Sequence, residues 1–99
     1  MKVKFRNSDL EVEFGQYWDG SLAIQLFDGG FPYATASVWV EGLKPGEIAV
    51  KNYSENAGML QALLSAGVVE KPHRTIAQGF VEFPIVRLTE KAMKELQLI

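Results

Sequence analysis

The sequence contains no cysteine, which excludes disulfide bonds, thiolate nucleophiles and every metal site built on cysteine ligands. An excess of charge is also missing: the net charge is −2 at pH 7, so no overall field attracts DNA, RNA or anionic lipid. Residues 1–14 alternate charged with apolar side chains, which is typical of neither a signal peptide nor a membrane-spanning segment. We therefore expect a soluble cytoplasmic protein with no cofactor, no metal ion and no membrane contact.

Motifs of the common enzyme classes are missing as well. The chain has no G-x-S-x-G, P-loop, dinucleotide-binding or H-E-x-x-H pattern, so no catalytic residue is assigned. What is present is an ordinary globular composition, with 47% hydrophobic and 22% charged residues in a length of 99. That length predicts one domain, residues 1–99, with a single small core.

Residues 1–40 alternate between apolar and polar positions, the pattern of strands with one buried face. Turn-forming residues separate the runs at Asn7-Ser8-Asp9, Asp19-Gly20 and Asp28-Gly29-Gly30. The inward rows are Val3 and Phe5; Leu10, Val12 and Phe14; Leu22, Ile24 and Leu26; and Ala34, Ala36, Val38 and Val40. The sequence predicts a meander of antiparallel strands.

Residues 47–99 combine short strands with two helices. Residues 47–51 and 81–85 alternate as strands, and Pro84 puts the second at a sheet edge or a bulge because proline cannot donate a ladder hydrogen bond. One helix is expected to end at Gly67, and Thr89 is the expected cap of a C-terminal helix. The predicted fold is α+β: an antiparallel, meander-rich sheet of five to seven strands, with one packed helix and a C-terminal helix.

A polar segment, residues 52–56, runs directly into the first predicted helix. Ser54 or Asn56 is expected to cap that helix, and Glu55 suits the positive end of the helix dipole. The alternative is a ligand loop in which Asn52, Ser54, Glu55 and Asn56 bind an anion. Capping is favoured because Gly58 is the only glycine near the segment, whereas phosphate-binding loops need several.

His73 is the only histidine, and it lies in residues 71–75, which we expect to form a proline-containing loop. With Lys71 and Arg74 it makes a small basic patch without interleaved aromatic residues, so nucleic-acid binding is not favoured. A catalytic role for His73 would need a carboxylate to orient it. Lys71, His73 and Arg74 are therefore candidate contacts for a protein partner.

Aromatic residues gather on the face of the predicted sheet opposite its inward rows. Tyr33 and Trp39 alternate with the inward residues of one strand, and Phe27 joins them from the preceding strand. Such a patch is either an interface with another protein or a second core beneath the C-terminal helix. The sequence leaves both alternatives open.

Four segments carry a resemblance when taken in order: YWDGSLAIQL, PYATASVWV, KNYSENAGMLQALLSAGVV and GFVEFPIVRL. Together they resemble a small uncharacterised protein family carried by bacterial mobile elements such as conjugative plasmids, integrated elements and phages. The resemblance covers residues 16–88, and the tail TEKAMKELQLI lies outside it. It implies a cytoplasmic accessory protein with no established activity and no catalytic residues to transfer.

The leading hypothesis is a non-enzymatic protein-interaction module of a mobile genetic element, acting as an inhibitor or adaptor of a host or element protein. One alternative is a small enzyme that uses His73 with a turn carboxylate. Another is a weak nucleic-acid-binding protein that uses Lys71, His73 and Arg74. The identity of the protein partner, and whether the chain forms a homodimer, are not determined by the sequence.

Overall fold

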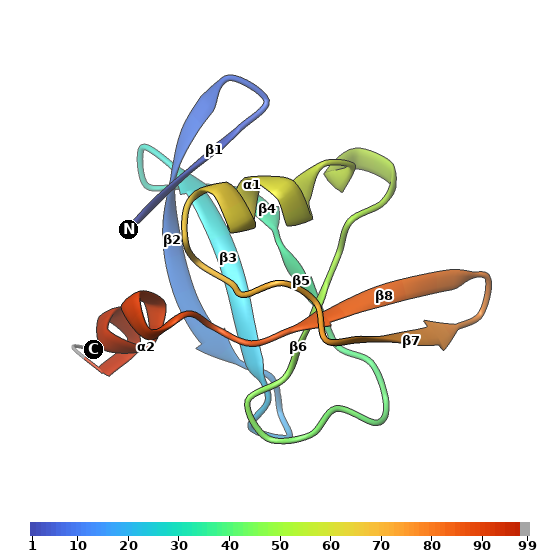
Figure 1. Ribbon diagram of the computed structural model, residues 1–99. Coiled ribbons are helices and arrows are strands. Elements are labelled where there is room, and N and C mark those ends of the chain that lie inside the picture. The colour runs from blue at the N-terminus through green and yellow to red at the C-terminus, as the bar shows by residue number, and fades with distance from the viewer. Residues whose placement is uncertain (98–99) are drawn as a thin grey trace.

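Two antiparallel sheets form the body of the computed structural model, which describes residues 1–97 (Figure 1). The first sheet has the order β1-β2-β3-β4, with β1 (Lys2–Phe5), β2 (Ser8–Gln16), β3 (Leu22–Asp28) and β4 (Phe31–Thr35). The second has the order β5-β6-β8-β7, with β5 (Ser37–Val38), β6 (Ile48–Val50), β7 (Arg74–Gln78) and β8 (Val81–Val86). The helices are α1 (Met59–Ser65), α2 (Glu90–Gln97) and the 3-10 helix η1 (Ser54–Asn56).

The structure confirms the α+β class but divides the strands between two sheets of four, where the sequence predicted one sheet of five to seven. The division falls at Ala36, between β4 and β5. Its N–H donates to Ile24 O of the first sheet (2.9 Å), and its carbonyl accepts from Lys51 N beside the second (2.8 Å). The predicted inward row is therefore split, with Ala34 and Ala36 in one core and Val38 and Val40 in another.

Three tight turns set the register of the first sheet. Arg6 and Asn7 join β1 to β2 with positive φ, so the predicted turn lies one residue earlier and Ser8 begins β2. At Asp19-Gly20, only Gly20 has positive φ (87°), and Tyr17 N donates to Ser21 O at 2.8 Å, so residues 18–20 form a three-residue loop rather than a two-residue one. Gly29 and Gly30 both have positive φ and close β3 onto β4, as predicted.

The main core is shared by both sheets and both helices. Its fully buried members include Val3, Leu10, Ile24, Leu26, Ile48, Val50, Met59, Leu63, Val86 and Ala92. A second cluster consists of Val40, Ala49, Phe83 and Ile85. Because Ile48 and Val50 face the main core while Ala49 faces the second cluster, β6 is buried on both sides, which explains its continuous apolar sequence.

The ends of α1 test two predictions. Its N-cap is Gly58, and neither Ser54 nor Asn56 caps it with a side-chain hydrogen bond, so that part of the prediction is wrong. At the other end, Gly67 has φ of 73°, Gly67 N donates to Leu64 O and Val68 N donates to Leu63 O. This pair of bonds is a Schellman ending and confirms the predicted C-terminus.

The segment expected to be a loop at residues 71–75 instead enters a strand. β7 begins at Arg74 and pairs with β8, and the resulting hairpin extends to one side of the molecule (Figure 1). Pro84 therefore lies in a central strand and not at a sheet edge. The ladder between β6 and β8 covers Ile85 and Val86 and stops before it reaches Pro84, so the missing N–H breaks no bond of that ladder.

The C-terminal helix begins as predicted. Thr89 Oγ1 accepts a hydrogen bond from Ala92 N at 3.1 Å, which is an N-cap bond. Ala92 is buried in the main core, and Leu96 packs against it. α2 therefore packs on the main core, whereas the side chain of Met93 is exposed.

Candidate functional site

The edge of the first sheet at β4 carries unusually exposed apolar side chains. β4 pairs with β3 and, in sheet order, has no strand on its other side within the described residues 1–97. Phe31 is 76% exposed and Tyr33 is 43% exposed. The register shifts between Leu26 and Phe27, which leaves Tyr33 outside the regular pairing of β4 with β3.

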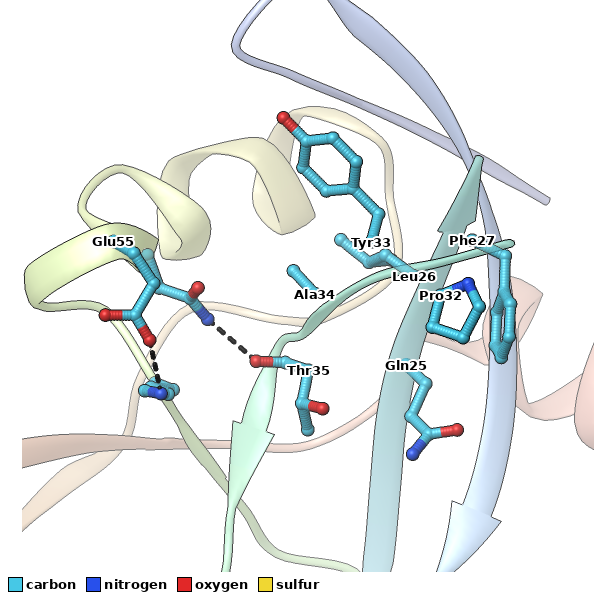
Figure 2. Close-up of a pocket in the computed structure, with 10 residues that line it drawn as sticks. Gln25, Leu26, Phe27, Pro32, Tyr33, Ala34, Thr35 and Glu55 are labelled. Carbon is cyan, nitrogen blue, oxygen red and sulfur yellow. Dashed lines mark hydrogen bonds and ion pairs between the residues drawn. The ribbon is translucent and has the colours of Figure 1, made fainter. Parts of the chain in front are cut away.

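A groove with a volume of about 420 Å³ lies beside this edge (Figure 2). It is lined on the sheet side by Gln25, Leu26, Phe27, Pro32, Tyr33, Ala34 and Thr35, and on the other side by Lys51, Glu55 and Asn56. The structure thus brings together two predicted partner-binding aromatics, Phe27 and Tyr33, with two residues of the predicted ligand loop, Glu55 and Asn56. Apolar and hydrogen-bonding groups converge here, as they do in binding clefts.

The polar wall of the groove is held in place by two contacts, which Figure 2 shows as dashed lines. Asn56 Nδ2 donates to Thr35 O at 2.7 Å and ties η1 to β4. Lys51 Nζ lies 2.6 Å from Glu55 Oε1. This hydrogen bond lowers the pKa of Glu55 and raises the pKa of Lys51, so both side chains are charged at neutral pH.

Asn52, the first residue of the predicted ligand loop, supports α1. Its Oδ1 accepts a hydrogen bond from Leu60 N at 2.8 Å, which satisfies a backbone donor in the first turn of the helix. The helix start is therefore capped by Asn52, which lies eight positions before Leu60 in the chain, rather than by Ser54 or Asn56. Ser54 instead occupies the left-handed region with φ of 55° at the start of η1.

Glu47 gathers two residues of the predicted basic patch. It is 2% exposed, and its carboxylate accepts hydrogen bonds from Arg74 Nε at 3.0 Å and Arg74 Nη2 at 2.5 Å. His73 Nε2 lies 2.6 Å from Glu47 Oε2, and Lys44 N donates to Glu47 Oε1 at 2.8 Å. Hydrogen bonds from Arg74, and then from His73, hold the pKa of Glu47 well below its ordinary value against the effect of burial.

The carboxylate that His73 meets is thus Glu47 and not one of the turn aspartates. Because Glu47 is ionised, the Nε2 atom of His73 donates the hydrogen bond. Arg74 also donates to Gly42 O at 2.9 Å, which ties β7 to the loop before β6. Lys71 is exposed in the segment that precedes β7. Sequence reasoning missed Glu47, since its partners lie 26 and 27 positions later in the chain.

Trp39 is not beside Tyr33 and Phe27. It is half-buried and stacks on Trp18, with ring centroids 5.2 Å apart. Its Nε1 donates to Asp19 Oδ2 at 2.8 Å. The three predicted aromatics therefore form no single patch: two of them line the groove, and Trp39 packs against the β2–β3 turn. Trp18 was missed because nothing in the sequence pairs it with a residue more than twenty positions away.

Comparison with protein-family models, with curated proteins and with solved structures finds no match for this chain. Across residues 1–97, no three histidine, aspartate or glutamate side chains lie close enough together to hold a metal ion. Neither helix in that part of the chain is both long and apolar enough to cross a membrane.

Proposed function

We propose that this protein is a non-enzymatic protein-interaction module that binds an extended segment of a partner protein along β4. The observation that carries the proposal is the open edge of β4, with Phe31 and Tyr33 exposed beside a groove of about 420 Å³. An exposed apolar edge strand is a ready template for another strand, and natural proteins usually protect such edges. Peptide recognition by strand addition uses this feature.

The backbone of β4 supports this mode of binding. Ala36 N donates to Ile24 O, so Thr35, the preceding residue, belongs to a pair whose backbone groups point away from β3. The outward carbonyl of Thr35 accepts from Asn56 Nδ2, in agreement with that alternation. The outward N–H of Thr35 is then available to a carbonyl of the partner strand. Phe27, Pro32 and Tyr33 supply apolar contacts for its side chains.

The proposed partner is a protein of the host or of a mobile element, and the proposed location is the cytoplasm. Both follow from the family resemblance of the four segments. The arrangement around Glu47 supports an interaction module over nucleic-acid binding, because Arg74 and His73 both hydrogen-bond to one buried carboxylate and thereby hold the loop against β7. The same contact gives His73 the orienting carboxylate that the enzyme alternative would need.

Two substitutions at one position test the proposal. The partner is first captured from host lysate and identified, and its dissociation constant is then measured with purified protein. Thr35→Pro removes the outward N–H without removing a bond to β3, and we expect it to weaken binding about tenfold, the value of one backbone hydrogen bond. Thr35→Ala keeps the N–H and is the matched control, with binding expected close to that of the original protein.

The melting temperature of both variants is measured first, so that a difference in affinity cannot come from a difference in folding. Equal affinity of the proline and alanine variants would rule out strand addition at β4. Amide exchange gives a second readout: the N–H groups of β4 should become protected when the partner binds. Protection confined to another surface would likewise contradict the proposal.

A further inference from the structure

The tip of the β2–β3 hairpin presents to solvent an aromatic ring that packs on a second aromatic ring. Trp18 is 81% exposed, and one side of its indole contacts Trp39, with ring centroids 5.2 Å apart and planes inclined by 42°. Trp39 is itself fixed by the hydrogen bond from its Nε1 to Asp19. An exposed ring that already packs on a second ring has less conformational freedom to lose when a ligand binds to it.

Asp19 places a negative charge next to this ring. Its Oδ1 accepts from Ser21 N at 3.0 Å and from Ser21 Oγ at 2.6 Å, and its Oδ2 accepts from Trp39 Nε1 at 2.8 Å. The hydrogen bonds from the Ser21 side chain, and then from Trp39, lower the pKa of Asp19 to about 2. The carboxylate is therefore ionised throughout the physiological range while remaining in contact with solvent.

The hairpin is also anchored at its base, so the tip is oriented by the body of the protein. Tyr17 Oη lies 3.0 Å from Ser37 Oγ, which in turn accepts from Ile24 N at 2.9 Å. The site is distinct from the β4 groove because the two lie at opposite ends of β3. That strand runs from Leu22, next to the Trp18 turn, to Asp28, next to β4.

We propose that the open face of Trp18, together with the Asp19 carboxylate, binds a positively charged side chain, arginine or lysine, of a protein partner. The face of an indole ring carries partial negative charge and attracts cations. The adjacent carboxylate adds a full negative charge, and a neutral apolar side chain would gain no electrostatic attraction from it. Charge complementarity thus selects the cationic residue among the side chains that stack on tryptophan.

One nearby cation opposes this binding. Exposed Lys44 and Asp19 line the same shallow hollow, of about 280 Å³, between the hairpin tip and residues 43–46. Lys44 is absent from the contacts that fix Asp19, whose hydrogen bonds come from Ser21 and Trp39. Removing its charge should therefore strengthen binding of a cationic ligand without loosening the site.

The test uses synthetic glycine-serine peptides that contain three arginines, and matched peptides in which neutral citrulline replaces each arginine. Binding is followed by the two indole N–H signals in nuclear magnetic resonance spectra, since the sequence contains two tryptophans. We expect the arginine peptide to shift the Trp18 signal in a saturable way. The citrulline peptide, which keeps the shape but not the charge, should bind at least about fivefold more weakly.

Three variants locate the effect. Trp18→Ala and Asp19→Asn should each raise the dissociation constant of the arginine peptide, and Lys44→Ala should lower it. Phe80→Ala, which changes another fully exposed aromatic residue at the β7–β8 turn, is the control and should change nothing. Equal binding of the arginine and citrulline peptides, or binding that Trp18→Ala leaves intact, would overturn the proposal.

Discussion

At the scale of single residues, the least expected feature is a buried carboxylate that pairs with an arginine and a histidine. Glu47 stands directly before β6; Arg74 balances its charge and His73 hydrogen-bonds to it, and each of these two side chains is about one third exposed. Such an arrangement rarely adds stability over an apolar substitute, but removing one partner leaves the others with an unmatched charge. The contact also joins β7 to the loop at residues 42–47 through Arg74.

Glu47→Gln tests this role. The side chain keeps its size but loses its charge, and we expect the free energy of unfolding at pH 7 to fall by about 2 kcal/mol, less than for a fully buried pair because Arg74 is partly solvated. Denaturant unfolding measures the change. Glu41→Gln, at an exposed position of the longer loop between β5 and β6, is the control and should have almost no effect.

The difference in stability between the original protein and Glu47→Gln should depend on pH. Because the pKa of Glu47 is lowered in the folded state, its contribution is complete above its ordinary value of 4.5 and is lost as the pH falls below it. The difference in stability between the original protein and Glu47→Gln should therefore shrink in acid. A difference that stays constant from pH 7 to pH 3 would show that the charge of Glu47 is not what stabilises the fold.

At the scale of elements, α1 shows that a short helix can take its cap from outside its own first residues. Its N-cap Gly58 offers no side-chain acceptor, and Asn52 Oδ1 supplies one to Leu60 N. The Schellman ending at Gly67 satisfies carbonyls at the other end. A helix of this length is marginal in isolation, so these bonds and the burial of Met59 and Leu63 are what hold it.

Substitutions at residues 52 and 54 separate the true cap from the predicted one. Asn52→Ala should lower the free energy of unfolding by about 1 kcal/mol, the usual value of a lost cap. Asn52→Asp keeps an acceptor oxygen and is expected to retain stability. Ser54→Ala should change little, since Ser54 makes no cap bond. Thermal melts of the three variants suffice, and a larger loss for Ser54→Ala than for Asn52→Ala would refute the assignment.

At the scale of the whole molecule, the two sheets are joined by more than the shared core. Buried Ser37, the first residue of β5, accepts from Ile24 N of β3 and contacts the Tyr17 hydroxyl. The backbone of Ala36 bonds to both sheets. Since these contacts lie where the chain passes from one sheet to the other, we expect the sheets to unfold as one cooperative unit.

Ser37→Ala is the variant that tests this junction. It leaves the buried N–H of Ile24 without its acceptor, and the expected loss is about 2 kcal/mol of unfolding free energy. Tyr17→Phe removes only the second, half-exposed contact and should cost less. Circular dichroism and tryptophan fluorescence should report one coincident transition in each protein. Two separated transitions would mean that the sheets are independently stable.

Much of the chain could be predicted because its signals are local. The turn at Gly29-Gly30, the end of α1 at Gly67 and the cap at Thr89 each depend on residues within a few positions, and the structure confirms all three. The alternation of Val3 and Phe5 likewise predicted their burial. The segment at β7 was missed because its proline and charges indicate a loop, while its pairing with β8 is what makes it a strand.

The sequence by itself determined the α+β class, most strands and turns, and the apolar rows, since backbone preference and side-chain periodicity act over neighbouring residues. Only the tertiary structure decided that the strands form two sheets and that Phe27 and Tyr33 line one groove with Glu55 and Asn56. It also decided that Trp39 packs on Trp18 and not beside those two aromatic residues. These outcomes depend on contacts between residues far apart in the chain, such as Asn56 with Thr35, 21 positions apart, and Trp39 with Asp19, 20 positions apart. No local pattern specifies such a pair, because its two members come together only when the whole chain folds around its core.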